Sequence, residues 1–194
     1  MSAELQRRSS PAPARGRILE TAYDLFYREG IRAVGVDQLI AASSVTKATF
    51  YKHYRSKDNL ILEYISARHR RFRDEFESMV TESEDAATAL RSIVDAAAKE
   101  ITRAGFRGCA FNNAAAEFPD PLHPLRRIVA DHRDWYVDAL ETLFRAIAHP
   151  FPGSAADEVL LARDGALAGA YMGDPVAATA ALGRMVSRVM AEAA

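Results

Sequence analysis

Residues 36–57 read VDQLIAASSVTKATFYKHYRSK, and this stretch decides our interpretation of the fold. Its apolar residues follow helical spacing, but Ser44 interrupts the pattern after about two helical turns. Thr46 then supplies a hydroxyl that suits the N-cap of a new helix. The stretch therefore predicts a short helix over 36–43, a tight turn and a second short helix over 47–53, which together form a helix-turn-helix motif.

Helices this short need support from neighbouring elements, because isolated helices below ~12 residues are marginal in water. An apolar stripe that starts at Ile18 predicts a preceding helix over residues 14–29, and Gly30 stands where a C-cap is expected. Ser56 can cap a long helix that begins near Lys57. We expect these helices to support the motif and to leave its second helix exposed, as entry into the major groove of DNA requires.

The second short helix carries side chains that suit contact with DNA. Six hydrogen-bond donors occur from its cap onward, and none is acidic: Thr46, Lys47, Thr49, Tyr51, Lys52 and His53. Cations and hydroxyls suit phosphates and base edges, whereas a carboxylate would be repelled by the DNA backbone. Lys57 adds a cation at a helix N-terminus, where a phosphate would offset its repulsion with the helix dipole. As an alternative, Tyr51 and His53 pack against the helix over residues 14–29, and Thr49 caps backbone carbonyls.

The net charge of −1 argues against a nucleic-acid partner only until its distribution is considered. Residues 1–57 contain 10 Lys and Arg against five acidic residues, a net charge of +5. Residues 58–194 contain 15 Lys and Arg against 21 acidic residues, a net charge of −6. A basic first part joined to an acidic remainder is typical of a DNA-binding region with a separate second function. Ordinary unevenness of surface charge is the alternative.

The rest of the chain also favours an all-α fold. Strand-like alternation is nowhere sustained, and no Pro lies between Pro13 and Pro119. Apolar residues at helical spacing predict further helices, which lie near residues 60–79, 90–101, 123–148, 155–171 and 176–191. We expect eight or nine helices in all.

The composition excludes several other classes of protein. A single Cys excludes an intrachain disulfide framework, and five His without metal-ligand spacing give no reason to expect a metal or another cofactor. No uncharged run approaches the ~18 residues that span a bilayer, and residues 1–8 lack the apolar segment of a secretion signal. We therefore expect no membrane partner and a cytoplasmic location.

Residues 17–62 resemble the N-terminal DNA-binding domain of the TetR family of bacterial transcriptional regulators. The most specific part is VTKATFYKHY at 45–54, followed by SKD at 56–58, which is similar to the family pattern V-S-x-x-T-x-Y-x-H-F…S-K-E. The resemblance implies that Lys47 and Thr49 contact bases or phosphates. It also implies that phosphates are contacted by Tyr51, His53 and Lys57.

Three positions depart from the family pattern. Ser44 stands where the turn usually has Gly, Ala48 replaces a frequent Gly, and Gly35 replaces the usual Thr cap. Because this turn favours a positive φ, we expect Ser44 to cost a little stability. Ser44 and Ala48 are also the support for an alternative function, a helical interaction protein with a vestigial helix-turn-helix motif.

The resemblance extends to the organisation of the whole chain. It implies a flexible arm over residues 1–12, a helix-turn-helix domain over 13–58 and an effector-binding and dimerisation domain over 59–194. Arg15 and Arg17 follow the arm directly. They are expected to be solvated, or to accompany an arm that reaches the minor groove.

Residues 107–124, RGCAFNNAAAEFPDPLHP, place polar groups beside aromatic rings. Together with aromatic residues elsewhere, they predict an apolar pocket with a few orienting polar groups, which would take an apolar or aromatic effector. The candidate pocket residues are Phe72, Phe76, Phe106, Cys109, Phe111, Asn112, Asn113, Glu117, His123, Trp135 and Tyr136. Plain core packing is the alternative for the aromatic residues. For Cys109 the alternatives are a reactive sensor thiol and an inert core residue.

Gly165, Gly169 and Gly173 recur every four residues, although each Gly inside a helix costs ~1 kcal/mol relative to Ala. Such a stripe indicates the close approach of another helix. With the Ala-, Val- and Met-rich residues 175–190, it predicts a four-helix dimer interface, which the resemblance also implies; packing within one chain is the alternative. The candidate interface residues are Gly165, Gly169, Gly173, Ala166, Ala170, Met185 and Val189.

Together these features predict a homodimeric regulator that binds a palindromic double-stranded DNA operator, represses transcription and is released by a small organic effector. Activation instead of repression is one alternative. An enzyme is another, with Cys109 as the nucleophile and His123 and Asp120 nearby, but Pro residues crowd this spacing and no oxyanion loop is evident. We therefore do not expect an enzyme.

Overall fold

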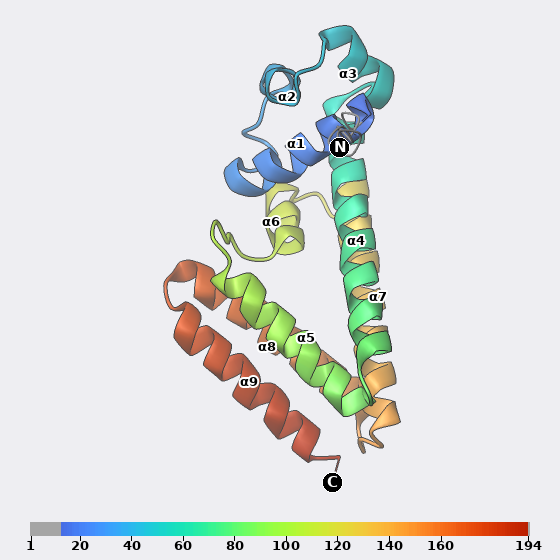
Figure 1. Ribbon diagram of the computed structural model, residues 1–194, viewed down its shortest axis with the longest axis vertical. Helices are drawn as coiled ribbons and strands as arrows, with labels where there is room; N and C mark the ends of the chain where they lie inside the picture. The colour runs from blue at the N-terminus through green and yellow to red at the C-terminus, as the bar shows by residue number, and fades with distance from the viewer. Residues whose placement is uncertain (1–12, 194) are drawn as a thin grey trace, which may run out of the picture. The chain divides into compact units, whose positions relative to one another are not determined.

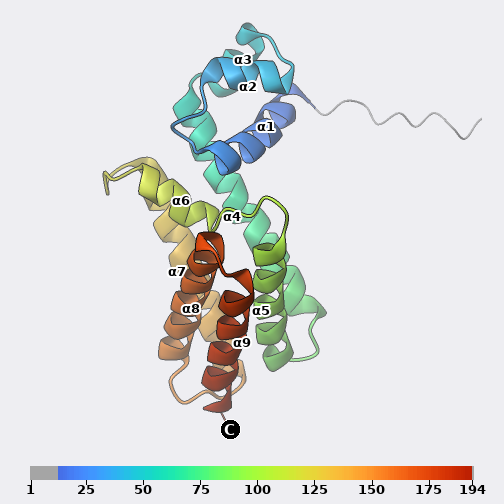
Figure 2. The same cartoon turned by 90° about the vertical axis from the view of Figure 1, so that its left-hand side faces the viewer.

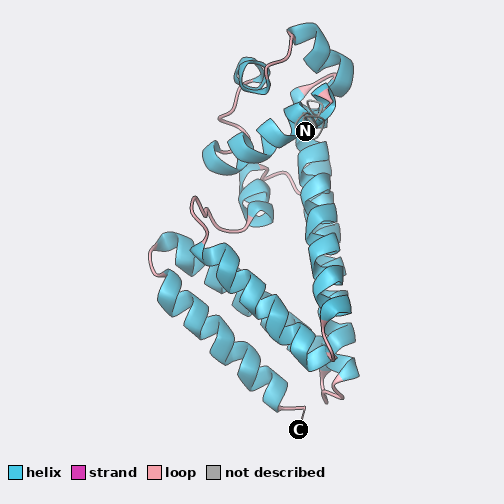
Figure 3. Cartoon of the chain, viewed as in Figure 1, coloured by secondary structure: helices cyan, strands magenta, loops and turns pink. Residues whose placement is uncertain are grey.

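A computed structural model describes residues 13–193 of the chain, and within this range every regular element is a helix (Figure 3). The nine helices of the described residues (Figure 1) are α1 (Ala14–Glu29), α2 (Val36–Ser43), α3 (Lys47–Tyr54), α4 (Lys57–Glu82), α5 (Ala86–Thr102), α6 (Ala110–Glu117), α7 (Pro124–Ala146), α8 (Pro152–Met172) and α9 (Pro175–Ala191). The predicted all-α fold is confirmed. The arm expected over residues 1–12 lies outside the described residues.

The chain folds as two compact units, which we call the head (residues 1–64) and the body (residues 65–194). Helix α4 is shared, since its first residues belong to the head and the others to the body. The division falls later than the boundary expected after residue 58. The physical reason is that Tyr64 packs into the head, where its ring meets that of Tyr23 edge to face with centres 5.3 Å apart.

The head consists of three short helices packed against the start of α4. Ile18, Leu39 and Phe50, one from each short helix, are fully buried. Gly30 ends α1 with a φ of 96°, a backbone conformation that glycine adopts without steric cost, and its N–H donates to the Phe26 carbonyl. The bounds predicted for α1 and α2 and the predicted C-cap are thus confirmed.

The body contains the long helices α5, α7, α8 and α9, the remainder of α4 and the short α6 (Figure 2). Helix α8 packs against both α7 and α9, and α5 contacts all three of these helices. Apolar residues of α7 at helical spacing, among them Leu125, Val129 and Leu140, are buried in the core. The helices predicted for this part of the chain are confirmed. Pro152 and Pro175 begin α8 and α9, because Pro suits the first turn of a helix.

None of the helices in the described part of the chain is both long and apolar enough to cross a membrane. Residues 13–193 also contain no group of three or more His, Cys, Asp or Glu side chains that could hold a metal ion. The candidate sites described below are therefore built from hydrogen-bonding, charged and aromatic side chains.

Candidate nucleic-acid interface

Helix α3 is attached to the head through side chains on its inner face. Phe50 is fully buried and Tyr54, four residues later on the same face, is 3% exposed. The Tyr54 hydroxyl donates a hydrogen bond of 3.1 Å to the backbone carbonyl of Arg15 in α1. Burial raises the pKa of Tyr54, which keeps this hydroxyl protonated as a donor. The two rings therefore fix the orientation of α3 and turn its opposite face outward.

The turn that precedes α3 has the backbone geometry expected from the sequence. Ser44 adopts the left-handed conformation, with φ 52° and ψ 48°. The Thr46 hydroxyl accepts a hydrogen bond of 3.1 Å from the N–H of Thr49, and the two hydroxyl oxygens lie 2.8 Å apart. Thr46 is thus the predicted N-cap of α3. The helix continues through Tyr54, one residue further than predicted.

Most of the predicted DNA contacts lie on the outward face of α3. The exposed ones are Lys47, Tyr51, Lys52 and His53, together with the capping residue Thr46. Tyr51 is 40% exposed even though its ring packs edge to face against Phe50, and Thr49 is half-buried. No acidic residue occurs between positions 46 and 57. The face therefore combines cations with neutral hydrogen-bond donors, which suits phosphates and base edges.

Lys57, the first residue of α4, already has interactions inside the head. Its ammonium group donates to the backbone carbonyl of Arg32 at 3.4 Å and lies 6.0 Å from the centre of the Phe26 ring. Ser56 caps this helix start as predicted, because its hydroxyl accepts from the N–H of Asn59 at 3.1 Å. A phosphate at Lys57 would therefore add to, or replace, an existing backbone contact.

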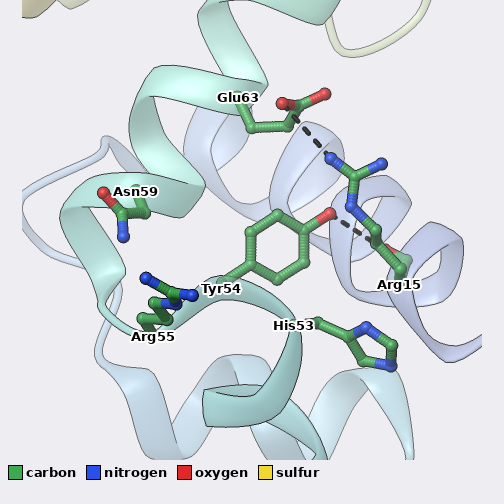
Figure 4. A pocket seen from close by; sticks show the side chains of 6 residues that line it. All are labelled: Arg15, His53, Tyr54, Arg55, Asn59 and Glu63. Carbon is green, nitrogen blue, oxygen red and sulfur yellow. Dashed lines mark hydrogen bonds and ion pairs between the residues drawn. The ribbon is translucent and has the colours of Figure 1, made fainter.

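The head has a surface pocket of about 300 Å³ (Figure 4). One of its lining residues, Arg55, was not among the predicted site residues. The residues that line it are Arg15, His53, Tyr54, Arg55, Asn59 and Glu63. The Arg15 and Arg55 side chains lie on either side of the Tyr54 ring (Figure 4), and Arg15 pairs with Glu63 at 3.4 Å. Arg55 follows α3 with a φ of 59°, which is uncommon for a residue other than Gly. The feature of the sequence that could have identified Arg55 is its position directly after the predicted helix.

The aromatic residues expected to line an effector pocket form a packed cluster in the body. Phe72 and Phe76 of α4 meet Trp135 and Tyr136 of α7 edge to face, with ring centres 5.2–6.0 Å apart. All four belong to the hydrophobic core of the body or pack directly against it. The structure thus brings these candidates together, and it does so as part of the core.

Two histidines that the sequence analysis did not connect lie beside this cluster. The Nδ1 atoms of His69 in α4 and His132 in α7 are 3.0 Å apart, so one ring donates a hydrogen bond and the other accepts it. Phe111 of α6 stacks on His132 with ring centres 3.6 Å apart. Burial, assisted by His69 and by the Arg163 and Arg133 cations, lowers the pKa of His132 from 6.5 to about 3. His132 is therefore neutral at pH 7.

The polar candidates of α6 have partners close to this helix. The Asn112 amide donates to the Asp164 carboxylate of α8 at 3.3 Å. The Asn113 amide donates to the backbone carbonyl of Arg107 at 2.8 Å. Glu117 is half-buried at the end of the helix. Asn112 is thus the candidate that links α6 to a charged group of the body interior.

The residues of the enzyme alternative have separate local roles. The His123 ring is the N-cap of α7, because its Nδ1 accepts from the N–H of Leu125 at 3.2 Å. The Asp120 carboxylate accepts from a backbone N–H at 2.9 Å in the preceding loop. Cys109 precedes α6 and, like Phe106, packs against the core. This arrangement does not point to a nucleophile with its base.

The predicted dimer residues lie on α8 and α9, which border an apolar groove of about 400 Å³. The residues that line the groove are Ala162, Gly165, Ala166, Gly169, Asp174, Ala177, Ala178, Ala181, Leu182 and Met185. Ala166, Ala170 and Val189 are buried in the body's own core. Gly173 ends α8 with a φ of 152°, a backbone conformation that favours glycine. This conformation explains a glycine at position 173 without a second chain. Of the predicted set, Gly165, Gly169 and Met185 line the groove without being buried in this core.

Comparison with known proteins connects this architecture to one family. Residues 18–64 match the family described as "Bacterial regulatory proteins, tetR family". The chain is 37% identical to SCO4454, a TetR-family transcriptional regulator from Streptomyces coelicolor, and the two structures superpose with a TM-score of 0.89 over 92% of this chain and 95% of that one. A TetR-family regulator from Agrobacterium tumefaciens, 20% identical, shares the fold with a TM-score of 0.81 over 90% of this chain and 96% of that one.

A sequence relative is the HTH-type transcriptional repressor KstR2 from Rhodococcus jostii (strain RHA1). It is 25% identical over 143 residues, which are 72% of this chain and 63% of the length of that relative. The chain thus matches less than two thirds of KstR2. Similarity to SCO4454 nonetheless extends over almost all of both chains, and the family match covers most of the head. The chain therefore belongs to the TetR family of bacterial transcriptional regulators.

Proposed function

We propose that this chain is a repressor that acts as a homodimer, binds a palindromic operator through its two heads and is released by a small organic effector. TetR-family proteins are transcriptional regulators, not enzymes, and they bind DNA operators as dimers. The observation that carries the proposal is the outward face of α3, where exposed cations and hydrogen-bond donors occur without an acidic residue. Phe50 and Tyr54 hold this face in a fixed orientation.

The charge distribution supports the same assignment of roles. The basic residues 1–57 include α3, whereas the remainder of the chain carries a net charge of −6. An acidic body is repelled by phosphates, so DNA contacts belong to the head. In a two-fold dimer, two copies of α3 would read half-sites about one turn of DNA apart or a multiple of it.

The groove between α8 and α9 is the proposed dimer surface, and its occupant is a second copy of this chain. A Cβ at Gly165 would meet nothing within 4 Å, and one at Gly169 would meet only the Cβ of Ala178 at 3.9 Å. Packing within one chain therefore does not require these glycines, although each costs about 1 kcal/mol relative to Ala in a helix. Large apolar side chains are also exposed on α8, with Leu161 at 65% and Tyr171 at 49%. Such a surface is typical of an interface.

Release by an effector would follow from the helix that the two units share. Helix α4 carries Phe72 and Phe76 in the aromatic cluster, and its first residues belong to the head. A ligand that binds one arrangement of this helix better than another would shift the population between DNA-binding and released dimers. The description of KstR2 as a repressor supports repression as the direction of control.

A gel-shift assay of the full chain with fragments of its source genome tests the proposal. We expect a discrete set of fragments to be retained, with an affinity that falls steeply as salt is added, by ~0.9 log units per phosphate contact for each decade of salt. Absence of sequence-specific binding even at low salt would end the proposal. If the protein instead dimerises and captures a protein partner without salt-dependent DNA affinity, the vestigial-motif alternative is correct. Transcription in vitro from a retained fragment separates repression from activation.

Sedimentation of a Gly165→Leu variant tests the dimer surface. The side chain would be tolerated in a single chain, because the space around Gly165 is open, but it would clash with a second copy in the groove. We expect this variant to be monomeric at concentrations where the wild type is a dimer. Ala130→Leu, at an exposed position of α7, is the matched control and should remain dimeric. A fully dimeric Gly165→Leu variant would place the interface elsewhere.

A further inference from the structure

A largely buried cation lies against two rings of the aromatic cluster of the body. Arg163 of α8 is only 14% exposed. Its guanidinium carbon lies 5.2 Å from the centre of the Phe72 ring and 5.4 Å from that of Tyr136. Burial opposes the charge, but Tyr136, Cys109 and Asp164 raise the pKa of Arg163 above its ordinary value. A cation therefore persists in an apolar environment, where the cost of desolvation is high unless a partner offsets it.

The acidic residue next to Arg163 is already engaged by other groups. The Asp164 carboxylate accepts a hydrogen bond of 2.5 Å from Arg133 and one of 3.3 Å from the amide of Asn112. Its distance to the Arg163 guanidinium is 4.0 Å, which is the limit for an ion pair. Two guanidinium groups thus share one carboxylate. The neighbouring His132 is neutral at pH 7 and therefore leaves the charge around Arg163 unchanged.

A second polar group in the cluster lacks a partner. The Tyr136 hydroxyl is fully buried and forms no hydrogen bond within the described residues. It lies close enough to Arg163 and Asp164 for their charges to influence its pKa, which burial raises. An orphaned buried hydroxyl costs free energy that a hydrogen-bond acceptor from outside the chain would recover.

We propose that the body binds an organic carboxylate whose anionic group pairs with Arg163 and accepts a hydrogen bond from the Tyr136 hydroxyl. The apolar part of the ligand would lie against aromatic rings of the cluster, such as those of Phe72 and Trp135. The anion supplies the negative charge that Asp164 shares with Arg133, and it satisfies the buried hydroxyl. The inference rests on the proposed function in one respect, namely that this anion is the effector.

Access to the cluster would come from α6. This helix of eight residues covers the cluster through the stacking of Phe111 on His132 and the hydrogen bond from Asn112 to Asp164. Helices this short are marginal without their packing partners. Displacement of α6 would therefore expose Arg163 and Tyr136 without unfolding the long helices of the body.

Isothermal titration calorimetry of the full-length protein tests the site with matched probes. 3-Phenylpropanoate and 1-naphthoate carry a carboxylate, and their amides, 3-phenylpropanamide and 1-naphthamide, have similar shape without charge. We expect the carboxylates to bind the wild type at least about tenfold more tightly than the amides, since hydrogen bonds between ionised groups are the strong ones. Arg163→Met should abolish this preference. Tyr136→Phe, which keeps the ring and its packing, should weaken carboxylate binding by about three- to tenfold.

Arg127→Met is the matched control, because Arg127 is a cation of α7 that is 82% exposed, and it should bind the carboxylates as the wild type does. Equal binding of carboxylates and amides, retention of carboxylate binding in Arg163→Met and Tyr136→Phe, or no binding of either carboxylate at millimolar concentration would each overturn the proposal.

Operator binding without added anion is measured on the same samples. Carboxylate binding without any operator binding would contradict the proposed function and leave the anion site intact. Operator binding without carboxylate binding would overturn the anion site alone. If both occur, release of the operator by carboxylate in the wild type but not in Arg163→Met identifies the anion as the effector.

Discussion

The head and the body place their polar side chains in opposite ways. In the head, Phe50 and Tyr54 occupy the interior, while Lys47 and neighbouring donors of α3 face outward. In the body, the Arg163 cation and the neutral His132 are enclosed by aromatic rings. An exposed polar face can meet a large polyanion without rearrangement, whereas enclosed groups are accessible only to a small ligand. The two proposed roles follow this difference: DNA binding is assigned to the exposed face of the head, and binding of a small anion to the enclosed groups of the body.

The largest expected effect concerns the anchor of the head. Phe50 is fully buried in the core of the head, so Phe50→Ala leaves a cavity there, and we expect it to lower the free energy of unfolding of the head by about 3–5 kcal/mol. Hydrogen exchange of the α3 amides and urea unfolding measure this loss. The exposed neighbour Tyr51→Ala is the control, with an expected cost below about 1 kcal/mol. Equal costs for the two variants would show that the buried ring does not anchor α3.

An intermediate effect concerns the enclosed histidine of the body. The pKa of His132 is about 3 in the folded protein and 6.5 ordinarily, so the unfolded chain binds this proton more tightly. The stability that His132 contributes is therefore complete above pH 6.5 and is lost as the pH falls toward 3. Between about pH 7 and pH 5 we expect a loss on the order of 1–2 kcal/mol.

Chemical denaturation of the wild type across this pH range measures the loss. His132→Phe removes the titrating group and keeps a ring against Phe111, so its stability should depend less on pH. His53→Phe, which changes an exposed residue of α3 and leaves His132 in place, is the control and should retain the pH dependence that His132 causes. Identical pH profiles for all three proteins would contradict the enclosure of His132.

The smallest expected effect concerns the turn before α3. Ser44 has a φ of 52°, which a residue with a Cβ adopts at a cost that Gly avoids. Because Gly also loses more entropy on folding, we expect Ser44→Gly to raise the free energy of unfolding of the head by only about 0.5 kcal/mol. Ala42→Gly, at an exposed helical position of α2, should instead lower it by about 1 kcal/mol. A destabilising Ser44→Gly would show that the hydroxyl has a role of its own.

The sequence predicted the head in more detail than the body, because the features that shape the head are local. The Thr46 cap and its Thr49 partner are three residues apart, and the left-handed Ser44 ends a helix of eight residues. The pocket that contains Arg55 was not predicted, because α1, α3 and α4 each contribute to it. Local chemistry defines a helix end, whereas a pocket depends on which helices meet.

In the body, helices could be predicted but their contacts could not. His69 and His132 are 63 residues apart, and helical periodicity indicates that each faces inward without showing that they meet. The contacts of Arg163 with the Phe72 and Tyr136 rings were not predicted either, because a single Arg on a helix is usually solvated. His123 is a different case, since the following Pro124 begins α7 and an N-cap is expected directly before such a Pro. A local signal for its role was therefore present.

The central claim, that the outward face of α3 reads DNA, is tested most directly by operator affinity as a function of salt. Fluorescence anisotropy with a retained genomic fragment compares the wild type, Lys47→Ala in α3 and Lys99→Ala, an exposed cation of α5 in the body. We predict that Lys47→Ala binds about tenfold more weakly, with a salt dependence reduced by about one phosphate contact, while Lys99→Ala matches the wild type. The claim would be contradicted if Lys47→Ala bound the operator with the same affinity and the same salt dependence as the wild type.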